Sequence, residues 1–248
     1  MATRAFPKAL PHGTLKKVFD DIYFVTGSVR APAPVPIVFS RNMTVVREGE
    51  SLTLINTLRL DDAGLAALDE LGKVEHVIRI AGFHGMDDPF YKDRYGAKVW
   101  GMKDQIYAAG FNDSPTNDDS YFHPDVEMTE DTELPISGAK IFQFKSANPP
   151  EGLVLLEREG GIIVSGDCLQ HWHSPDAYFN FPARLMMKLM GFFKPHNVGP
   201  GWLKGAKPDT GEVKSILELE FDHVLPVHGE EVIGNAKELY RPAIERLG

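Results

Sequence analysis

Two blocks of short apolar runs, each followed by helical sequence, constrain the fold of this chain more than any other feature. The first block contains four β-type runs broken by Gly, Pro, Asn and Glu residues: 22–25, 37–39, 43–46 and 52–55. The second block contains three such runs: 140–145, 152–156 and 161–164. Strand blocks that alternate with helices predict two sheets packed face to face and covered by helices.

The first block predicts an antiparallel meander. Pro32, Pro34 and Pro36 lie between its first two runs, and proline cannot donate ladder hydrogen bonds, so we expect a projecting loop there. A helix capped by Asp61 or Asp62 and stopped by Gly72 follows the meander. The chain continues with a strand over 74–80, a helix through Tyr95 and a strand over 98–100, which together predict a βαβ-like unit.

The second half of the chain alternates in the same way. The acidic, turn-rich segment 112–133 predicts a surface excursion before the second β block. Behind that block we expect a helix around 185–193, a helix over 210–219, a strand at 224–225 and a last helix.

Composition limits the classes of partner. The 248 residues are 43% hydrophobic, enough for a single domain over 1–248 to bury a core without disulfides. A net charge of −9 without a dense Lys/Arg cluster excludes nucleic acid as an expected partner. The lone Cys168 indicates a reducing compartment, hence the cytoplasm. No apolar run approaches the roughly 20 residues of a membrane span, so we expect no membrane partner. The expected partner is a small-molecule substrate or ligand.

Polar residues with metal-binding chemistry follow three of the expected strands. His84 and Asp88 follow the strand over 74–80. Asp167 follows Gly166 at the end of the strand over 161–164, and His228 lies in Pro226-Val227-His228-Gly229 after the strand at 224–225. Side chains just past the carboxyl ends of strands are well placed to form a site.

These motifs, in this order, resemble the metallo-β-lactamase superfamily over about residues 22–240. The family's first signature is HxHxDH. His84 and Asp88 match it, whereas Met86 and Pro89 stand where its second and third histidines would be. The resemblance implies an α/β protein with a four-layer αββα sandwich and one divalent ion. Zinc is the preferred ion, with iron or manganese as alternatives.

The resemblance also assigns roles to individual residues. His84, Asp88, Asp167 and His228 become candidate metal ligands, and Asp88 is also the predicted catalytic residue. The family's second motif has no histidine here, and Asn148 or Glu151 could substitute for it. The early strand Arg41-Asn42-Met43-Thr44-Val45-Val46 resembles a divergent branch of the superfamily in which the first motif is reduced.

Two further histidines could complete the ligand set. His171 and His173 follow Asp167 at i, i+2 spacing, which puts both on one side of an extended segment. The structural alternative is a polar loop anchored by Trp172. Structural alternatives also exist for the other candidates: a turn residue for His84, a helix cap for Asp88, an arginine partner for Asp167 and a turn-stabilising role for His228.

The Met-rich segment 181–193 is apolar nearly all round, apart from Arg184 and Lys188 at i, i+4. We expect a buried helix there. The alternatives are a pocket wall or lid for an apolar substrate, or the contact of a homodimer.

These features predict a metal-dependent hydrolase that attacks a small ester, thioester, lactone or phosphoester with metal-bound hydroxide. The alternative is a metal-free relic of the fold that binds a small molecule or a protein. The missing histidines at Met86 and Pro89 favour the relic, and the retained motifs at Asp167 and His228 favour the enzyme.

Overall fold

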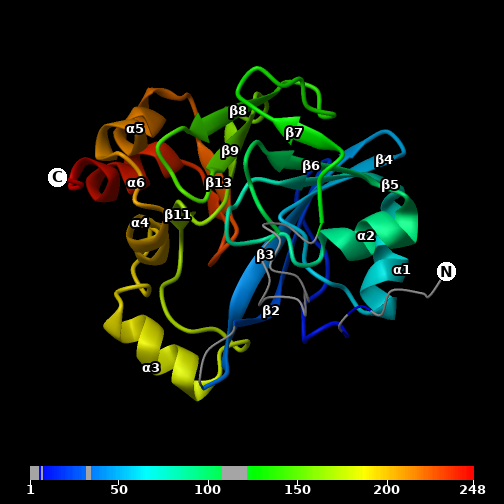
Figure 1. Ribbon diagram of the computed structural model, residues 1–248, viewed down its shortest axis with the longest axis horizontal. Helices are drawn as coiled ribbons and strands as arrows, with labels where there is room; N and C mark the ends of the chain where they lie inside the picture. Colours follow the sequence, from blue (N-terminus) through cyan, green and yellow to red (C-terminus); the bar gives the residue numbers. More distant parts are fainter. Residues whose placement is uncertain (1–5, 7, 32–34, 108–121) are drawn as a thin grey trace.

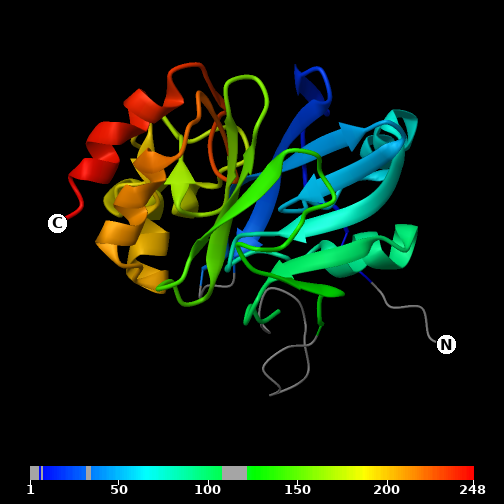
Figure 2. The ribbon, with the colours of Figure 1, turned by 90° about the horizontal axis from the view of Figure 1, so that it is seen from above.

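A computed structural model describes residues 6, 8–31, 35–107 and 122–248, which form two large sheets with helices outside them (Figures 1 and 2). The first sheet has seven strands in the order of the sequence. They are β1 (Lys16–Phe19), β2 (Ile22–Ala31), β3 (Ile37–Glu48), β4 (Ser51–Ile55), β5 (Lys73–Arg79), β6 (Lys98–Met102) and β7 (Val126–Met128). Strands β1 to β4 pair antiparallel, and β4 to β7 pair parallel.

The second sheet has five strands in the order β14-β13-β10-β9-β8. They are β8 (Ala139–Phe144), β9 (Glu151–Leu156), β10 (Ile162–Ser165), β13 (His223–Pro226) and β14 (Val232–Ile233). Strands β10 and β13 pair parallel, so their carboxyl ends lie at the same edge. A separate two-stranded ribbon joins β11 (Leu169–Gln170) to β12 (Asn197–Val198).

Helices cover the outer faces of both sheets (Figure 2). The described helices are α1 (Asp62–Leu71), α2 (Asp88–Tyr95), α3 (Phe181–Leu189), α4 (Pro200–Ala206), α5 (Thr210–Lys214), the 3₁₀ helix η1 (Ser215–Glu218) and α6 (Ala236–Glu245). Helices α1 and α2 pack on the first sheet, and α4, α5 and α6 pack on the second. The expected αββα sandwich is therefore observed. None of the helices in the described part of the chain is long and apolar enough to cross a bilayer.

Alternation along the strands builds the layers. In β5, Val77 faces the core under α1 and α2, while Ile78 faces the core between the sheets. In β10, Ile162 and Val164 face the core between the sheets, and Ile163 faces the core under α4 to α6. Strands covered on both faces are apolar on both, which explains their continuous hydrophobic runs.

The first block differs from expectation in one respect that matters for the site. The runs 37–39 and 43–46 belong to one strand, β3, which pairs with β2 through the intervening Ser40, Arg41 and Asn42. These three residues are buried although they are polar. Polar residues interrupt the apolar pattern of the sequence, but here they continue the strand. The prolines at 32 and 34, and part of the segment 112–133, lie outside the described residues.

Most helix signals are confirmed. Asp61 is the N-cap of α1, since its side chain accepts a hydrogen bond from the backbone N–H of Gly64, and Gly72 is the C-cap. The N-cap position of α2 is Asp87, so Asp88 is the first helical residue and not the cap. The expectation of a buried helix at α3 is wrong, because only Ala183 and Met187 are buried there.

Candidate metal site

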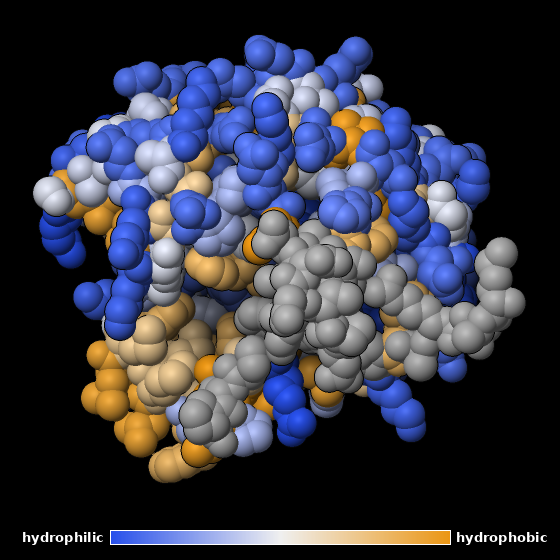
Figure 3. All heavy atoms as spheres, in the orientation of Figure 1, coloured by the Kyte–Doolittle hydropathy of each residue, from blue (hydrophilic) through white to orange (hydrophobic). Residues whose placement is uncertain are grey.

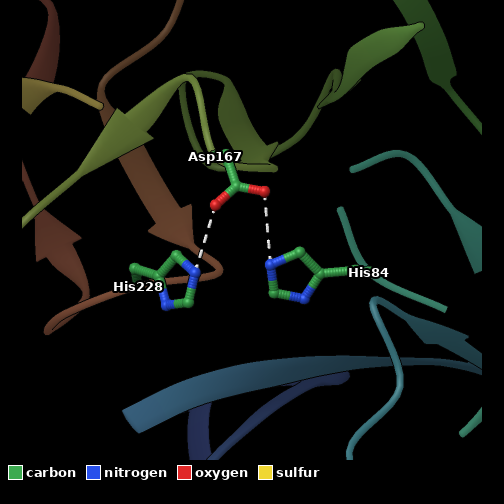
Figure 4. Close-up of side chains that lie close together, drawn as sticks. All are labelled: His84, Asp167 and His228. Carbon is green, nitrogen blue, oxygen red and sulfur yellow. Dashed lines mark ion pairs between the residues drawn. The ribbon is translucent and has the colours of Figure 1, made fainter. Parts of the chain in front are cut away.

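Three side chains from three strand ends meet at one edge of the sandwich (Figure 4). His84 lies in the loop after β5, Asp167 lies two residues after β10, and His228 lies two residues after β13. Nε2 of His84 is 3.3 Å from Oδ2 of Asp167, and Nε2 of His228 is 3.2 Å from Oδ1. All three residues are at least 92% buried. We call this set the His-Asp-His group.

The hydrogen bonds of His228 determine which of its nitrogens carries a proton. Nδ1 lies 2.9 Å from the carbonyl oxygen of Ser40, which can only accept, so Nδ1–H donates. In a neutral imidazole, Nε2 is then unprotonated, and its lone pair faces Oδ1 of Asp167. Two acceptors at 3.2 Å require a cation or a proton between them.

His84 is held in place by a buried arginine beneath its loop. Arg79 donates from Nε to the carbonyl of Ala81 at 3.2 Å and from Nη2 to the carbonyl of Gly82 at 2.6 Å. Gly85 has a φ of +97° and packs against Arg79, so a side chain would collide there. Burial lowers the pKa of His84, and the negative charge of Asp167 opposes this shift.

Asp167 is a buried carboxylate between two imidazoles. Burial favours a higher pKa, but His84 and His228 outweigh it and hold the pKa of Asp167 well below its usual range. No described residue donates a hydrogen bond to its Oδ2. A buried carboxylate oxygen without a donor is costly unless a cation balances it.

Glu151 positions the loops that carry Asp167 and His84. Its Oε1 accepts from the backbone N–H of Cys168 at 2.8 Å, and its Oε2 accepts from Gly82 at 3.3 Å. Burial, together with the negative charge of Asp167, raises the pKa of Glu151 well above its usual range. Glu151 is the residue that could substitute for the missing second-motif histidine, and the structure places it beside the His-Asp-His group and not within it.

The segment Ser40 to Asn42 of β3 forms the floor of the site. The Asn42 side chain donates to the carbonyls of Pro226 at 2.8 Å and Gly229 at 2.6 Å, which fixes the loop that carries His228. Arg41 forms a buried ion pair with Asp87, in the loop after His84. The sequence associated this strand with a branch of the superfamily but predicted no role for these residues. The polar residues between two apolar runs were the signal that could have indicated their contact with the site.

Comparisons with known proteins concern the fold. No protein-family model matches the chain, and neither does any curated protein. Solved structures do match over nearly their whole length: VMB-1 at a TM-score of 0.65 and 15% identity, covering 96% of this chain and 98% of that one. The metallo-β-lactamase FIM-1 from Pseudomonas aeruginosa, in its mono-zinc form, matches at a TM-score of 0.63 and 15% identity, covering 98% of each chain. A metallo-β-lactamase from Erythrobacter litoralis matches at 0.59 and 14% identity, covering 96% and 95%.

The protein has the metallo-β-lactamase fold. The resemblance predicted from the sequence motifs is therefore confirmed for the architecture. Within this fold, the His-Asp-His group joins three of the predicted ligands: His84, Asp167 and His228.

Asp88, the remaining first-motif residue of the metallo-β-lactamase fold, lies outside this group. It is fully buried, and its carboxylate accepts hydrogen bonds from Thr57 Oγ1 at 2.5 Å and the Tyr107 hydroxyl at 2.7 Å. Burial raises its pKa to about 6, although both hydrogen bonds oppose the shift. Each carboxylate oxygen of Asp88 therefore accepts a hydrogen bond from a protein side chain, whereas Oδ2 of Asp167 accepts none from the described residues. The predicted roles of Asp88 as ligand and catalytic residue gain no support from this geometry.

His171 and His173 form a second group with Glu230, separate from the first. Their Nε2 atoms are 3.1 Å apart, and Nδ1 of His171 accepts from the backbone N–H of His196 at 3.1 Å. Burial, and then His196 and His173, lower the pKa of His171 to about 4. The structure therefore does not bring these histidines to Asp167.

Proposed function

We propose that this protein is a metal-dependent hydrolase with a single divalent ion bound by His84, Asp167 and His228. The substrate in this proposal is a small ester, thioester, lactone or phosphoester. Three protein ligands with one open position are the usual arrangement of a catalytic zinc site. Zinc is the preferred ion because two imidazoles and one carboxylate suit it, and iron or manganese would accept the same donors.

The observation that carries the proposal is the contact between His228 and Asp167. The Ser40 carbonyl holds the proton of His228 on Nδ1, so the Nε2 lone pair faces a carboxylate oxygen. Nε2 of His84 lies 3.3 Å from Oδ2 of the same carboxylate, so both imidazole nitrogens lie beside Asp167. These three residues would hold the ion.

The surroundings of the group also support a metal. Within the described part of the chain, Asp167 Oδ2 has no hydrogen-bond donor. The side chains are buried, so the atoms that would bind the metal are already dehydrated and fixed. The mono-zinc form of FIM-1, whose fold is similar, supports one ion as a sufficient complement for this architecture. Met86 and Pro89 replace two histidines of the family signature, which also favours one ion over two.

A divalent ion at this place would act as a Lewis acid and supply a nucleophile from water at neutral pH. The chain's own residues do the positioning. Ser40 orients His228, Arg79 shapes the loop of His84, and Glu151 joins the loops of His84 and Asp167. Outer partners of this kind fix the direction of the ligands and contribute to metal affinity.

The test is elemental analysis of protein purified without chelator. We expect close to one equivalent of transition metal in the wild type and a large loss in Asp167→Asn, which keeps the shape but removes the charge. Folding should survive in the variant, because a core of this size does not depend on a metal. Metal should also leave as the pH falls through about 6.5, where free histidine protonates.

A metal-free relic would behave differently. In that case the wild type carries no stoichiometric metal, takes none up from zinc, manganese or iron, and matches Asp167→Asn in thermal stability with and without these ions. The contact between His228 and Asp167 would then be a structural pair, and the proposal of a hydrolase would be replaced by that of a binding protein.

A further inference from the structure

Helix α3 presents a ridge of large apolar side chains to solvent. Phe181, Leu185 and Leu189 follow one another at intervals of four residues and are 77%, 53% and 80% exposed, and Met190 is 41% exposed. Side chains at this spacing lie along one face of a helix. Figure 3 shows the resulting apolar area over α3, at lower left. We call these four residues the α3 ridge.

The opposite face of α3 is firmly attached to the protein. Ala183 and Met187 are buried against Trp172 and Phe179. The N-cap Asn180 accepts from the backbone N–H groups of Ala183 and Val38 and so ties the start of the helix to β3. The ridge is therefore a fixed outer surface, because α3 already has its own contribution to the core on the other side.

Val35 extends the apolar surface beyond the helix. It is 58% exposed and lies next to Pro36, whose carbonyl accepts from the Asn180 side chain at 2.8 Å. Isolated exposed apolar residues are ordinary, but a contiguous group of this kind marks an interaction site.

The sequence of α3 and of the segment after it carries charge of one sign. The stretch 177–208 contains five Lys or Arg residues and no Asp or Glu, in a chain whose net charge is −9. Lys188 and Lys194 are exposed, and so is Arg184, which also donates to the carbonyls of Phe179 and Asp176. The acidic residue next in sequence, Asp176, accepts from the backbone N–H of Tyr178. The ridge is thus apolar, and the charged side chains on α3 and in the loop after it are cationic.

We propose that the α3 ridge docks on the surface of a bilayer that contains anionic lipid. An apolar helix face beside Lys and Arg residues is the arrangement that inserts at the boundary of headgroups and acyl chains. A second copy of the chain fits less well, because a two-fold contact through this ridge would bring the same cations together across the interface. A peripheral contact needs no spanning segment, so the proposal replaces the expectation of no membrane partner.

The test uses the full-length protein with vesicles of phosphatidylcholine alone or with about one third phosphatidylglycerol. We expect co-sedimentation with the anionic vesicles, weaker binding to the neutral ones, and loss of binding at 0.5 M salt, where surface charges are screened. Leu185→Glu with Leu189→Glu should weaken binding at least about tenfold. Lys188→Glu should weaken it severalfold. Leu239→Glu is the matched control, an exposed leucine on α6, and should bind as the wild type does.

Three results would overturn the proposal. One is the absence of binding to either kind of vesicle. Another is equal binding by the wild type and the Leu185/Leu189 variant, with both folded by circular dichroism. The third is a dimer mass by light scattering that Leu189→Glu converts to a monomer, which would assign the ridge to a second copy. The proposal does not rest on the metal site, and metal content should be the same in all these variants.

Discussion

The His-Asp-His group and the group of His171, His173 and Glu230 look alike in composition but differ in their outer hydrogen bonds. Each contains two imidazoles and a carboxylate with donor atoms within 4.8 Å of one another. In the first group, Nδ1 of His228, the ring nitrogen farther from Asp167, donates to a backbone carbonyl. In the second group, Nδ1 of His171, the ring nitrogen farther from His173, accepts from a backbone N–H.

This difference reverses which ring nitrogen carries the proton in the neutral histidine. His171 accepts at Nδ1, so its neutral form carries the proton on Nε2 and donates it to Nε2 of His173 at 3.1 Å. That contact is satisfied by a hydrogen bond between the two rings. The contact of His228 with Asp167 is not satisfied in this way. The backbone partner of each histidine therefore decides which nitrogen of its neutral ring carries the proton.

The largest expected effect separates the two groups by metal content. His228→Ala should lower the affinity for zinc by more than about a hundredfold, since loss of an outer partner alone costs ten- to hundredfold and here a direct ligand is removed. His173→Ala should leave the metal content unchanged. Elemental analysis after dialysis measures both. The opposite pattern, with metal lost from His173→Ala and kept in His228→Ala, would show that the proton assignment is wrong.

A second prediction uses Asp88, which belongs to neither group. Its pKa is raised to about 6, so between its ordinary value and 6 the folded state holds a proton that the unfolded state has released. The free energy of unfolding therefore falls as the pH rises through this window, by about 2–3 kcal/mol in total. Asp88→Asn cannot titrate and should lack this fall.

Urea denaturation of wild type and Asp88→Asn at several pH values between 4 and 7 measures the difference. Asp88 contacts Thr57 and Tyr107 and not the His-Asp-His group, so we expect Asp88→Asn to have the same metal content as the wild type. Loss of metal from Asp88→Asn would place Asp88 in the ligand set and remove the contrast on which the comparison depends.

The last prediction concerns His171, in the second group. Its pKa is lowered to about 4, so the folded state keeps it neutral where free histidine binds a proton. The free energy of unfolding should fall as the pH drops from about 6.5 to 4, because burial and the neighbouring His196 and His173 disfavour the protonated ring in the folded state. Proton NMR titration of the histidine rings checks the pKa. A value near 6.5 would mean that the ring pair is open to solvent.

Local patterns were enough to predict the positions of two candidate ligands. Asp167 follows an apolar strand and a glycine, and His228 follows a strand and a proline, so sequence alone placed both at strand ends. His84 was placed in the same way. Each of these assignments depends on only a few neighbouring residues, and the structure confirms the strand that precedes each one.

Other predictions failed or stayed open because they depend on distant partners. The break expected at Ser40 to Asn42 was wrong, because loops about 40 to 190 residues away pair with these polar side chains inside a strand. The buried helix expected at α3 was also wrong. Its composition is apolar nearly all round, but only one face meets the aromatic cluster around Trp172.

By itself, the sequence determined the two β-rich halves, the βαβ-like order and the strand ends that carry His84, Asp167 and His228, because periodicity and turn residues act over short distances. Tertiary structure alone decided which candidates meet. It put Asp88 against Thr57 and Tyr107 and gave His171 a backbone donor, whereas His228 received a backbone acceptor. The state of an imidazole depends on the atom opposite its far nitrogen. In this fold, that atom comes from another strand or loop.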